Sequence, residues 1–466
     1  MRIPIFWTII AAVIGVVLVG IVGVSLIQPD QPLVTSAGFD RDEITPNADG
    51  ETDVANFTYD LTRNATVSIL LQDADGITYA FRDSQERIPQ SYTVQFGGVV
   101  DGFVLPDEVL GGTVERRLLP DGDYTWELVA ETSDGEVVTF DGSLAVRDAD
   151  VPLPDIVTFT VSNPVFTPNQ DGRTDRVEIN VYVAKADAEV SVVLIGEDGQ
   201  EIPISSRKEG NTSGDEQRHP FDYEGGIDLN AEPPPDGTYI IRATATDDEG
   251  QRVSATSELT IQNGGKPFAE IVAQAVGVDV VFITMPYDER FFSDTERMGD
   301  LVEMPDDPAA FAATDITMNV GDMLVFMLTV ENYSDVPIRT TWPPPGTVYQ
   351  QDQRPAAMGQ NDSPGAWRVG IECDASKSSY PYRWAIGTED VLITEVVSED
   401  EVYYYLPPNT RSVVWGAIRF TEIDATRNPQ TCYAGLIHED VALSERNSRV
   451  GPRSVELVEI ESTSDE

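Results

Sequence analysis

The chain has 466 residues, with 80 acidic and 30 basic side chains and a formal net charge of −50. Such a surface repels nucleic-acid phosphates, which bind proteins through Lys and Arg, so we expect no nucleic-acid partner. The hydrophobic fraction of 41% is typical of folded domains and not of a disordered tail. An acidic surface also suits a salt-rich habitat, where charge repulsion is screened, so acidity alone does not mark a binding site.

The chain begins with an uncharged, mostly apolar run over residues 3–27. A helix rises about 1.5 Å per residue and the hydrocarbon core of a membrane is roughly 30 Å thick, so this run is long enough to span it. Arg2 precedes the run and Asp30 follows it, which predicts a cytoplasmic N-terminus. We therefore expect residues 1–29 to be a transmembrane signal-anchor helix in the cell membrane, with the bulk of this single-pass chain extracytoplasmic.

A cleaved signal peptide is the alternative to an anchor. Signal peptides have a shorter apolar region and small residues before the cleavage site. The tripeptide at residues 23–25, Gly-Val-Ser, has small residues at both ends and could serve as that site. Both interpretations export the rest of the chain.

An internal repeat organises the following part of the chain. Residues 44–61 read ITPNADGETDVANFTYDL, and residues 166–183 read FTPNQDGRTDRVEINVYV. In each copy, a T-P-N-x-D-G-x-T-D loop precedes a segment in which every second side chain is apolar, the pattern of a half-buried strand. Further on, LPDGDYTWELVAETSDGE (119–136) matches PPDGTYIIRATATDDEGQ (234–251), and the first copy is longer in its middle.

The repeat predicts two Ig-like β-sandwich domains, over residues 35–148 and 155–263. Each copy contains short alternating strands, and Asp-Gly pairs at 75–76 and 198–199 indicate hairpin turns. The prolines of VPLPD (151–155) predict a short, stiff linker. The expected fold class is all-β, with tandem Ig-like β-sandwiches after one N-terminal transmembrane helix.

These motifs resemble bacterial Ig-like domains. The pattern T-P-N-x-D-G-x-x-D, alternating strands, D-G and P-D-G-x-Y is similar to the flagellar hook-capping Ig-like module and to the C-terminal modules of gliding-motility surface proteins. The resemblance implies a β-sandwich used for spacing and surface attachment. The family usually has Gly where Ala48 and Gln170 stand, and Asn where Thr52 and Thr174 stand. An anchor takes the place of the flagellar N-terminal portion, so we do not expect a hook-capping role.

Each T-P-N-x-D-G loop places three oxygen donors within a short stretch that contains a glycine. Ca²⁺ binds several such oxygens at short range, so each loop is a candidate calcium site and Ca²⁺ is the one candidate cofactor. Alternatively, these side chains accept hydrogen bonds from backbone N–H groups and shape the turns without metal. The candidate ligands are Asn47, Asp49, Asp53, Asn169, Asp171 and Asp175.

Residues 267–460 are predicted to form a C-terminal β-sandwich domain, and residues 461–466 an acidic tail. Residues 320–333 are apolar on both faces, which is typical of a central strand. The Gly-Asp before this strand and the Asn-Tyr-Ser-Asp at its end resemble, over a short length, a bacterial Ig-like module of the cell-adhesion-related type.

The two cysteines of the chain, Cys373 and Cys432, are expected to form a disulfide, because exported chains meet oxidising conditions. Each lies on the apolar face of an alternating segment, which favours an internal bond between strands. Together with Trp384 they echo the Cys-Trp-Cys spacing of immunoglobulin domains, although Gln430 stands where those domains have a tyrosine. Two free buried thiols are the alternative.

Aromatic side chains gather in the C-terminal part, where nearby polar residues would suit recognition of a sugar or a peptide. Packing in the core is the alternative. The candidate ligand surface comprises Trp342, Tyr380, Tyr382, Arg383 and Trp384.

The sequence contains no nucleophile elbow, paired-histidine zinc motif or phosphate loop, so we expect the protein not to be an enzyme. The expected function is that of a membrane-anchored extracytoplasmic scaffold that spaces and displays a distal β-domain. Its expected partners are the membrane, through residues 3–27, and other surface proteins or glycans. A glycan- or protein-binding adhesin that acts through the aromatic-rich C-terminal domain is the first alternative, and a hydrolase in that domain is the second.

Overall fold

The computed structural model describes residues 31–206, 217–274, 277–306, 315–360, 363–398 and 401–459. The predicted membrane anchor and the acidic tail lie outside these ranges. Within them, no helix is both long and apolar enough to cross a membrane.

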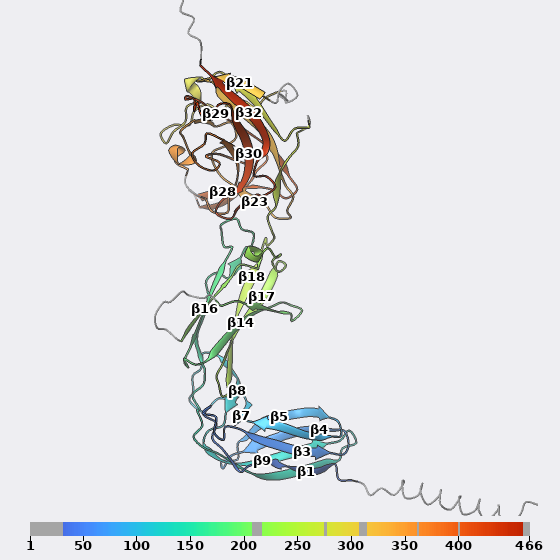
Figure 1. The fold of residues 1–466 in the computed structure, drawn as a ribbon. Coiled ribbons are helices and arrows are strands. Elements are labelled where there is room, and N and C mark those ends of the chain that lie inside the picture. Colours follow the sequence, from blue (N-terminus) through green and yellow to red (C-terminus); the bar gives the residue numbers. More distant parts are fainter. Residues whose placement is uncertain are drawn as a thin grey trace, which may run out of the picture.

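The described chain is all-β and forms three bodies that follow one another along the chain (Figure 1). The second domain lies between the other two, and the strands of the first domain run across the direction of those of the second. The first domain pairs a sheet of β1 (Val34–Phe39), β3 (Ala55–Leu61) and β6 (Ser91–Phe96) with a sheet of β2 (Glu43–Ile44), β10 (Val137–Val146), β9 (Gly122–Glu131), β4 (Ala65–Gln72) and β5 (Thr78–Arg87).

The second domain repeats this plan, and its larger sheet takes in two strands from the first copy. The sheets are β11 (Ile156–Val161), β13 (Val177–Val183) and β16 (Arg218–Tyr223), and then β15 (Glu201–Ile204), β14 (Glu189–Ile195), β17 (Gly237–Thr246), β18 (Arg252–Ile261), β8 (Thr113–Leu118) and β7 (Val99–Asp101), with β12 (Val165–Phe166) beside β18. A 3₁₀ turn, η1 (Ile227–Leu229), follows β16.

The period-two patterns of both copies predicted the buried faces correctly. In β3, every second residue from Ala55 to Leu61 is buried, and β13 shows the same alternation from Val177 to Val183. These faces form two separate hydrophobic cores, one in each domain. The prediction of two β-sandwich repeats is confirmed at this level.

The predicted boundary of the first domain needs one correction. The extra length in the middle of the first copy forms the hairpin β7–β8, and β8 pairs antiparallel with β18 of the second domain. Val100 packs in the first core, whereas Val114 packs against the second. Residues 99–118 therefore belong to both domains, and periodicity could not predict this because it does not specify which strand will be the neighbour.

The C-terminal domain also has two sheets, around a core of aliphatic and aromatic side chains. The smaller sheet contains β19 (Ala269–Val272), β22 (Met323–Asn332), β29 (Arg411–Arg419) and β24 (Val348–Gln350), with β20 (Val280–Met285) beside β22. The larger sheet contains β21 (Asp315–Asn319), β32 (Val450–Val458), β30 (Gln430–His438), β25 (Trp367–Cys373), β23 (Ile338–Thr340), β28 (Glu401–Leu406) and β27 (Ile393–Ser398), with β26 (Tyr382–Ala385) beside β25 and β31 (Ala442–Leu443) beside β30. Two 3₁₀ turns, η2 (Glu289–Phe291) and η4 (Pro355–Met358), lie in its loops.

The predicted central strand is β22. It lies between β19 and β20 on one side and β29 on the other, and its side chains are buried on both faces.

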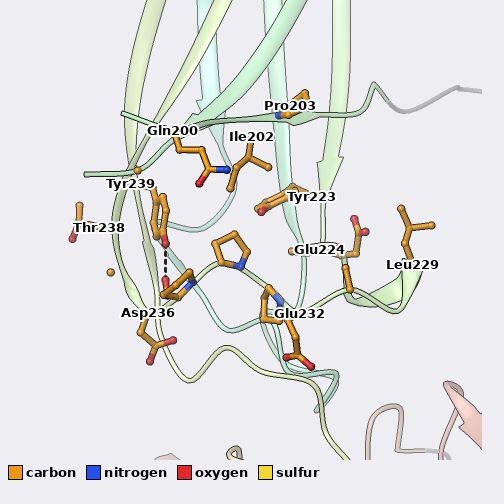
Figure 2. A pocket seen from close by; sticks show the side chains of 18 of the residues that line it. Gln200, Ile202, Pro203, Tyr223, Glu224, Leu229, Glu232, Asp236, Thr238 and Tyr239 are labelled. Atoms are coloured by element: carbon orange, nitrogen blue, oxygen red, sulfur yellow. Dashed lines mark hydrogen bonds between the residues drawn. The ribbon is translucent and has the colours of Figure 1, made fainter. Parts of the chain in front are cut away.

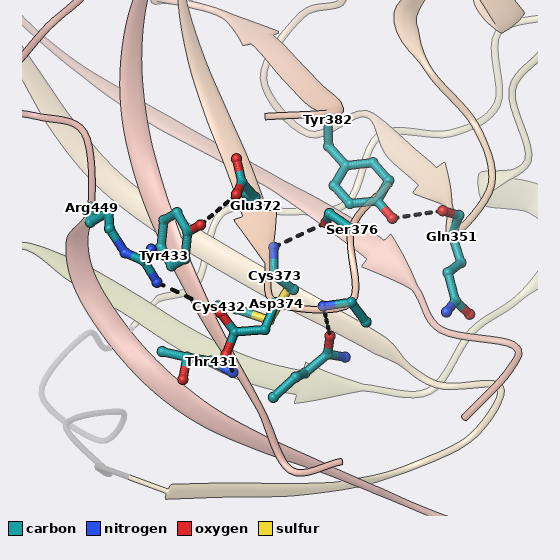
Figure 3. Close-up of a disulfide and its surroundings, with 12 residues drawn as sticks. Gln351, Glu372, Cys373, Asp374, Ser376, Tyr382, Thr431, Cys432, Tyr433 and Arg449 are labelled. Carbon is teal, nitrogen blue, oxygen red and sulfur yellow. Dashed lines mark hydrogen bonds and ion pairs between the residues drawn. A yellow bond between two sulfur atoms is a disulfide. The ribbon is translucent and has the colours of Figure 1, made fainter. Parts of the chain in front are cut away.

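The disulfide between Cys373 and Cys432 is present (Figure 3). The two residues are directly opposite each other in the adjacent antiparallel strands β25 and β30, with Cα atoms 4.0 Å apart. In immunoglobulin domains the equivalent bond joins the two sheets. The bond here lies within one sheet. The Cys-Trp-Cys spacing is therefore similar to that of immunoglobulin domains, but the position of the disulfide in the fold is different.

Candidate functional sites

The two T-P-N-x-D-G loops share one hydrogen-bonding scheme. In the first loop, the Asp53 carboxylate accepts from the backbone N–H groups of Asn47 and Gly50, at 3.3 and 2.7 Å. The Asn47 side-chain oxygen accepts from the N–H of Asp49 at 3.1 Å. These are turns in which Asn and Asp side chains bind backbone N–H groups, which is one of the two interpretations that the sequence allowed.

The second loop reproduces the first almost atom for atom. Asp175 accepts from the N–H groups of Asn169 and Gly172, at 3.3 and 2.6 Å, and Asn169 accepts from the N–H of Asp171 at 3.1 Å. Among the described residues, no group of three or more His, Cys, Asp or Glu side chains is placed to hold a metal ion. Calcium binding and metal-free turns remain the two alternatives, and a chelator distinguishes them.

Four residues of these loops have left-handed backbone conformations. The φ angles are 58° at Ala48, 55° at Gln170, 63° at Thr52 and 48° at Thr174. A side chain with a Cβ is strained there, and a β-branched one most of all. At these four positions the bacterial Ig-like domains that the repeats resemble usually have Gly or Asn. Gly and Asn adopt a left-handed backbone more easily than the residues found here.

The two loops differ in what covers them. Asp49 is exposed, whereas Asp171 is 6% exposed because the second loop packs against the C-terminal domain. A Cβ added to Gly172 would lie 2.0 Å from the carbonyl oxygen of Pro364, so only glycine fits at this contact. The same turn is thus a free surface in one copy and an interface in the other.

Polar contacts hold the second loop in place. The Tyr405 hydroxyl donates to the Asp171 carboxylate at 3.0 Å. Arg173 Nη1 donates to the Glu395 carboxylate at 2.6 Å and to the Tyr405 hydroxyl at 3.1 Å. His438 Nε2 lies 2.7 Å from the carbonyl oxygen of Gln170, and because that oxygen can only accept, Nε2 must carry the proton.

Burial at this junction shifts several pKa values. Desolvation raises the pKa of Asp171, and burial together with the nearby Asp171 charge raises the pKa of Asp175 to about 6. Burial lowers the pKa of His438 to about 4, so the ring is neutral at physiological pH. His438 stacks on Trp367, with ring centroids 4.4 Å apart, at the end of the disulfide-bearing sheet.

The junction between the first two domains depends on a fully buried amide. The Gln251 side chain donates to the carbonyl oxygens of Asp150 and Pro152, at 3.1 and 2.9 Å, and accepts from the N–H of Leu118 at 3.2 Å. Gln251 is 0% exposed. One side chain therefore ties together the linker, the β7–β8 hairpin and the second domain.

A lysine reinforces the same junction. Lys185 Nζ lies 2.8 Å from carboxylate oxygens of Asp150, Asp247 and Glu249. The Asp155 carboxylate, at the end of the linker, accepts from the N–H groups of residues 111 and 112. Contacts with both domains hold the proline-containing linker, in addition to the stiffness that its sequence predicted.

The predicted ligand surface is wrong for Tyr382 and Trp384, which lie in the core. Tyr380, Tyr382 and Trp384 are each 3% exposed or less, whereas Trp342 is 40% exposed and stands apart. Trp384 lies edge-on to the rings of Phe326 and Tyr349 in the core. Tyr382 and Trp384 belong to the core between the two sheets, whereas Tyr380 packs with Tyr433 and Ile437 in a separate cluster.

Tyr380 and Arg383 do, however, line a cavity of about 330 Å³ on the outer side of the larger C-terminal sheet. Arg354 and Arg368 line it as well. Sequence reasoning missed Arg368, although the alternation of Trp367 and Val369 on the core face already implied that Arg368 points the other way.

A wider cleft, of about 740 Å³, opens at the end of the second domain (Figure 2). The rings of Tyr223 and Tyr239 and the prolines at 233–235 line it, and the Tyr239 hydroxyl donates to the Pro235 carbonyl oxygen at 2.7 Å. Tyr124 makes the matching bond to Pro120 in the first domain, also at 2.7 Å, so this rim is part of the repeated fold. The acidic residues in the lining are Glu197, Asp198, Asp222, Glu224, Glu232 and Asp236.

No protein-family model and no curated protein matches the sequence. Among solved structures, the chain is similar to an E. coli alpha-2-macroglobulin, with 10% identity and a TM-score of 0.19 over 92% of this chain and 23% of that one. It therefore spans less than a quarter of the length of that protein.

Two further similarities are to adhesion proteins. One is a Ca²⁺-stabilized, ice-binding adhesin of an Antarctic bacterium, with 10% identity and a TM-score of 0.20 over 91% of this chain and 74% of that one. The other is a tetra-tandem repeat from the extending region of a large adhesion protein, with 12% identity and a TM-score of 0.15 over 88% and 97%. TM-scores this low do not establish a shared arrangement of domains or a shared function.

Proposed function

We propose that the protein is a membrane-anchored extracytoplasmic spacer that acts by binding and not by catalysis, and that holds its C-terminal domain at a fixed distance and angle. The observation that carries this proposal is that both domain junctions are built from buried, specific contacts. At the first junction, β8 joins the sheet of the second domain and Gln251 ties the linker. At the second junction, the loop around Asp171 is buried against the C-terminal domain.

Domains that are joined by flexible linkers do not need such contacts. Relative motion of domains is the default when the interface between them is small and polar, and buried contacts on both sides of a linker oppose that motion. The resemblance of the two repeats to spacing and surface-attachment modules agrees with this role, and the predicted anchor over residues 3–27 would fix one end at the membrane.

Distance measurements between spin labels on the full chain in detergent test the proposal. Val137 in the first domain and Val396 in the C-terminal domain are both exposed, so cysteines introduced there can carry labels. A rigid spacer gives a distance distribution about as narrow as that of a pair within one domain, such as Ile88 with Val137. A broad distribution between the first and last domains contradicts the spacer role.

Topology needs its own test. If the part of the chain after residue 30 faces away from the cytoplasm, protease added to cells whose cytoplasmic membrane is intact should cleave it. If cleavage requires disruption of the membrane, the proposed location is wrong.

An adhesin that binds a ligand through its C-terminal domain is a second candidate. The observation that favours it is the arginine-lined cavity beside Tyr380. The two candidates are compatible, because a spacer can display a binding domain.

A further inference from the structure

Arg368 is an unusual residue for its position in the fold. It lies in β25, the strand that carries Cys373, and is 2% exposed. Its Nη1 lies 3.3 Å from the Glu439 carboxylate, whereas its Nε and Nη2 have no hydrogen-bond partner in the described part of the chain. A buried donor without an acceptor is costly, so it calls for an explanation such as a bound water, ion or ligand.

The charges around Arg368 do not balance within the protein. Glu439 also accepts from Arg383 Nη1 at 2.5 Å, so one carboxylate serves two guanidinium groups. Arg354 lines the same cavity, and its Nη1 donates only to the carbonyl oxygen of its neighbour, Gln353. Among the residues that the structure describes, none of those that line the cavity is acidic. In a chain with a net charge of −50, this is a local excess of positive charge.

Two paired strands, β25 and β30, support the wall of the cavity that contains Tyr380. Gly370 in β25 and Gly435 in β30 are opposite each other, and the Tyr380 ring lies over both. A Cβ on Gly435 would come within 2.4 Å of that ring, so the pair of glycines leaves the space that Tyr380 occupies. The Tyr380 N–H donates to the Glu372 carboxylate at 2.8 Å, which fixes the segment that forms one wall.

The remaining walls combine polar and apolar groups. Ser378 and Ser379 contribute hydroxyl groups and Gln360 contributes an amide. Pro355, Pro381 and the Tyr380 ring contribute apolar surface. The volume of about 330 Å³ is at the lower end of the range for small-molecule sites, which run from roughly 300 to 1,000 Å³.

We propose that this cavity binds the carboxylate of an acidic sugar residue, with Arg368, Arg383 and Arg354 facing the carboxylate and the serine and glutamine side chains bonding to ring hydroxyls. Guanidinium groups match planar carboxylates in paired hydrogen bonds. A singly charged carboxylate on a neutral sugar ring is favoured over phosphate, because the net negative charge of the protein repels a dianion more strongly. This inference does not depend on the spacer role.

Titration calorimetry of the full chain in detergent at low salt tests the proposal, with D-glucuronate and D-galacturonate as probes. D-glucose, D-galactose and inorganic phosphate are the comparison ligands. We expect binding of at least one uronate, weaker or absent binding of the neutral sugars and of phosphate, and a loss of affinity as salt is added. Absence of uronate binding at millimolar concentrations overturns the proposal, as does equal or tighter binding of a neutral sugar or of phosphate.

Variants locate the site. Arg354→Gln should weaken uronate binding by about tenfold, as expected for the loss of one charge-assisted contact. Its melting temperature should change little, because within the described residues Arg354 donates only to Gln353 and its guanidinium lies 5.8 Å from the centroid of the Tyr382 ring, a distance at which a cation–π contact is weak. Arg446→Gln is the matched control, since Arg446 pairs with Glu270 outside the cavity and the charge change is the same. Equal losses in the two variants would indicate non-specific attraction and would overturn the site.

Discussion

The Nε2 atom of His438 in the C-terminal domain lies 2.7 Å from the carbonyl oxygen of Gln170 in the second domain. Gln170 is in the second T-P-N-x-D-G loop, at a position where the first repeat has Ala48 on a free surface. This single hydrogen bond therefore marks where one copy of a repeated turn has become an interface.

The His438 contact should make the junction sensitive to acid. Burial lowers the pKa of His438 to about 4, below the usual value of 6.5, so its contribution to stability is complete above pH 6.5 and is lost as pH falls toward 4. The stability advantage of the native chain over His438→Gln should therefore shrink by up to about 1.4 kcal/mol per pH unit in that window. Denaturant unfolding of both proteins between pH 7 and pH 4 measures this difference, and a constant difference would contradict it.

Backbone strain in the first loop should be relieved by glycine. Ala48 has a φ of 58° and lies in the exposed loop, so Ala48→Gly should stabilise the first domain by about 0.5–1 kcal/mol. Ala145→Gly is the control, because Ala145 lies where β10 pairs with β9 without a register shift, and the change there should destabilise by about the same amount. Thermal melts compare the two, and destabilisation by Ala48→Gly would refute the strain argument.

Loss of the buried amide at the first junction should be severe. Gln251→Ala removes four hydrogen bonds, one of them to the Asp247 carboxylate, and takes this partner from the N–H of Leu118 and from two linker carbonyl oxygens. We expect destabilisation of about 2–4 kcal/mol and a broader distance distribution between labels on the first and last domains. The exposed Gln95→Ala should change neither quantity. A Gln251 variant with unchanged stability would show that the junction does not depend on this side chain.

Removal of the disulfide should affect one domain selectively. The bond closes a loop with a sequence separation of 59, and its loss through Cys373→Ser with Cys432→Ser should cost about 2–4 kcal/mol. We expect the C-terminal domain to melt earlier while the unfolding of the two repeats stays in place. Domain-resolved hydrogen exchange follows each transition, and equal shifts in all three domains would contradict the expectation.

A chelator should leave both repeats unchanged. The carboxylates of Asp53 and Asp175 already accept backbone N–H groups, so the loops keep their shape through hydrogen bonds. The melting temperature in EDTA should therefore equal that in excess Ca²⁺. A lower melting temperature in EDTA would instead support calcium binding by the two loops.

Local patterns predicted much of the fold, because burial of one strand face is visible as period-two alternation. The alternation in β3 and β13, the Asp-Gly turns and the pairing of Cys373 with Cys432 all follow from short segments or from residue type. Tyr382 and Trp384 were mispredicted as ligand-binding residues, because an aromatic cluster has the same sequence signature in a core as on a surface. Arg368 was missed because its importance comes from what surrounds it and not from its own segment.

The sequence by itself determined that two repeated β-sandwiches precede a third β-domain, since each strand and turn has its own chemistry. The tertiary structure alone decided how the domains meet. Asp49 and Asp171 occupy equivalent positions in the two loops, yet one is exposed and the other is buried beneath Tyr405. The difference arises from residues more than two hundred positions away, and local periodicity carries no information about contacts at that separation.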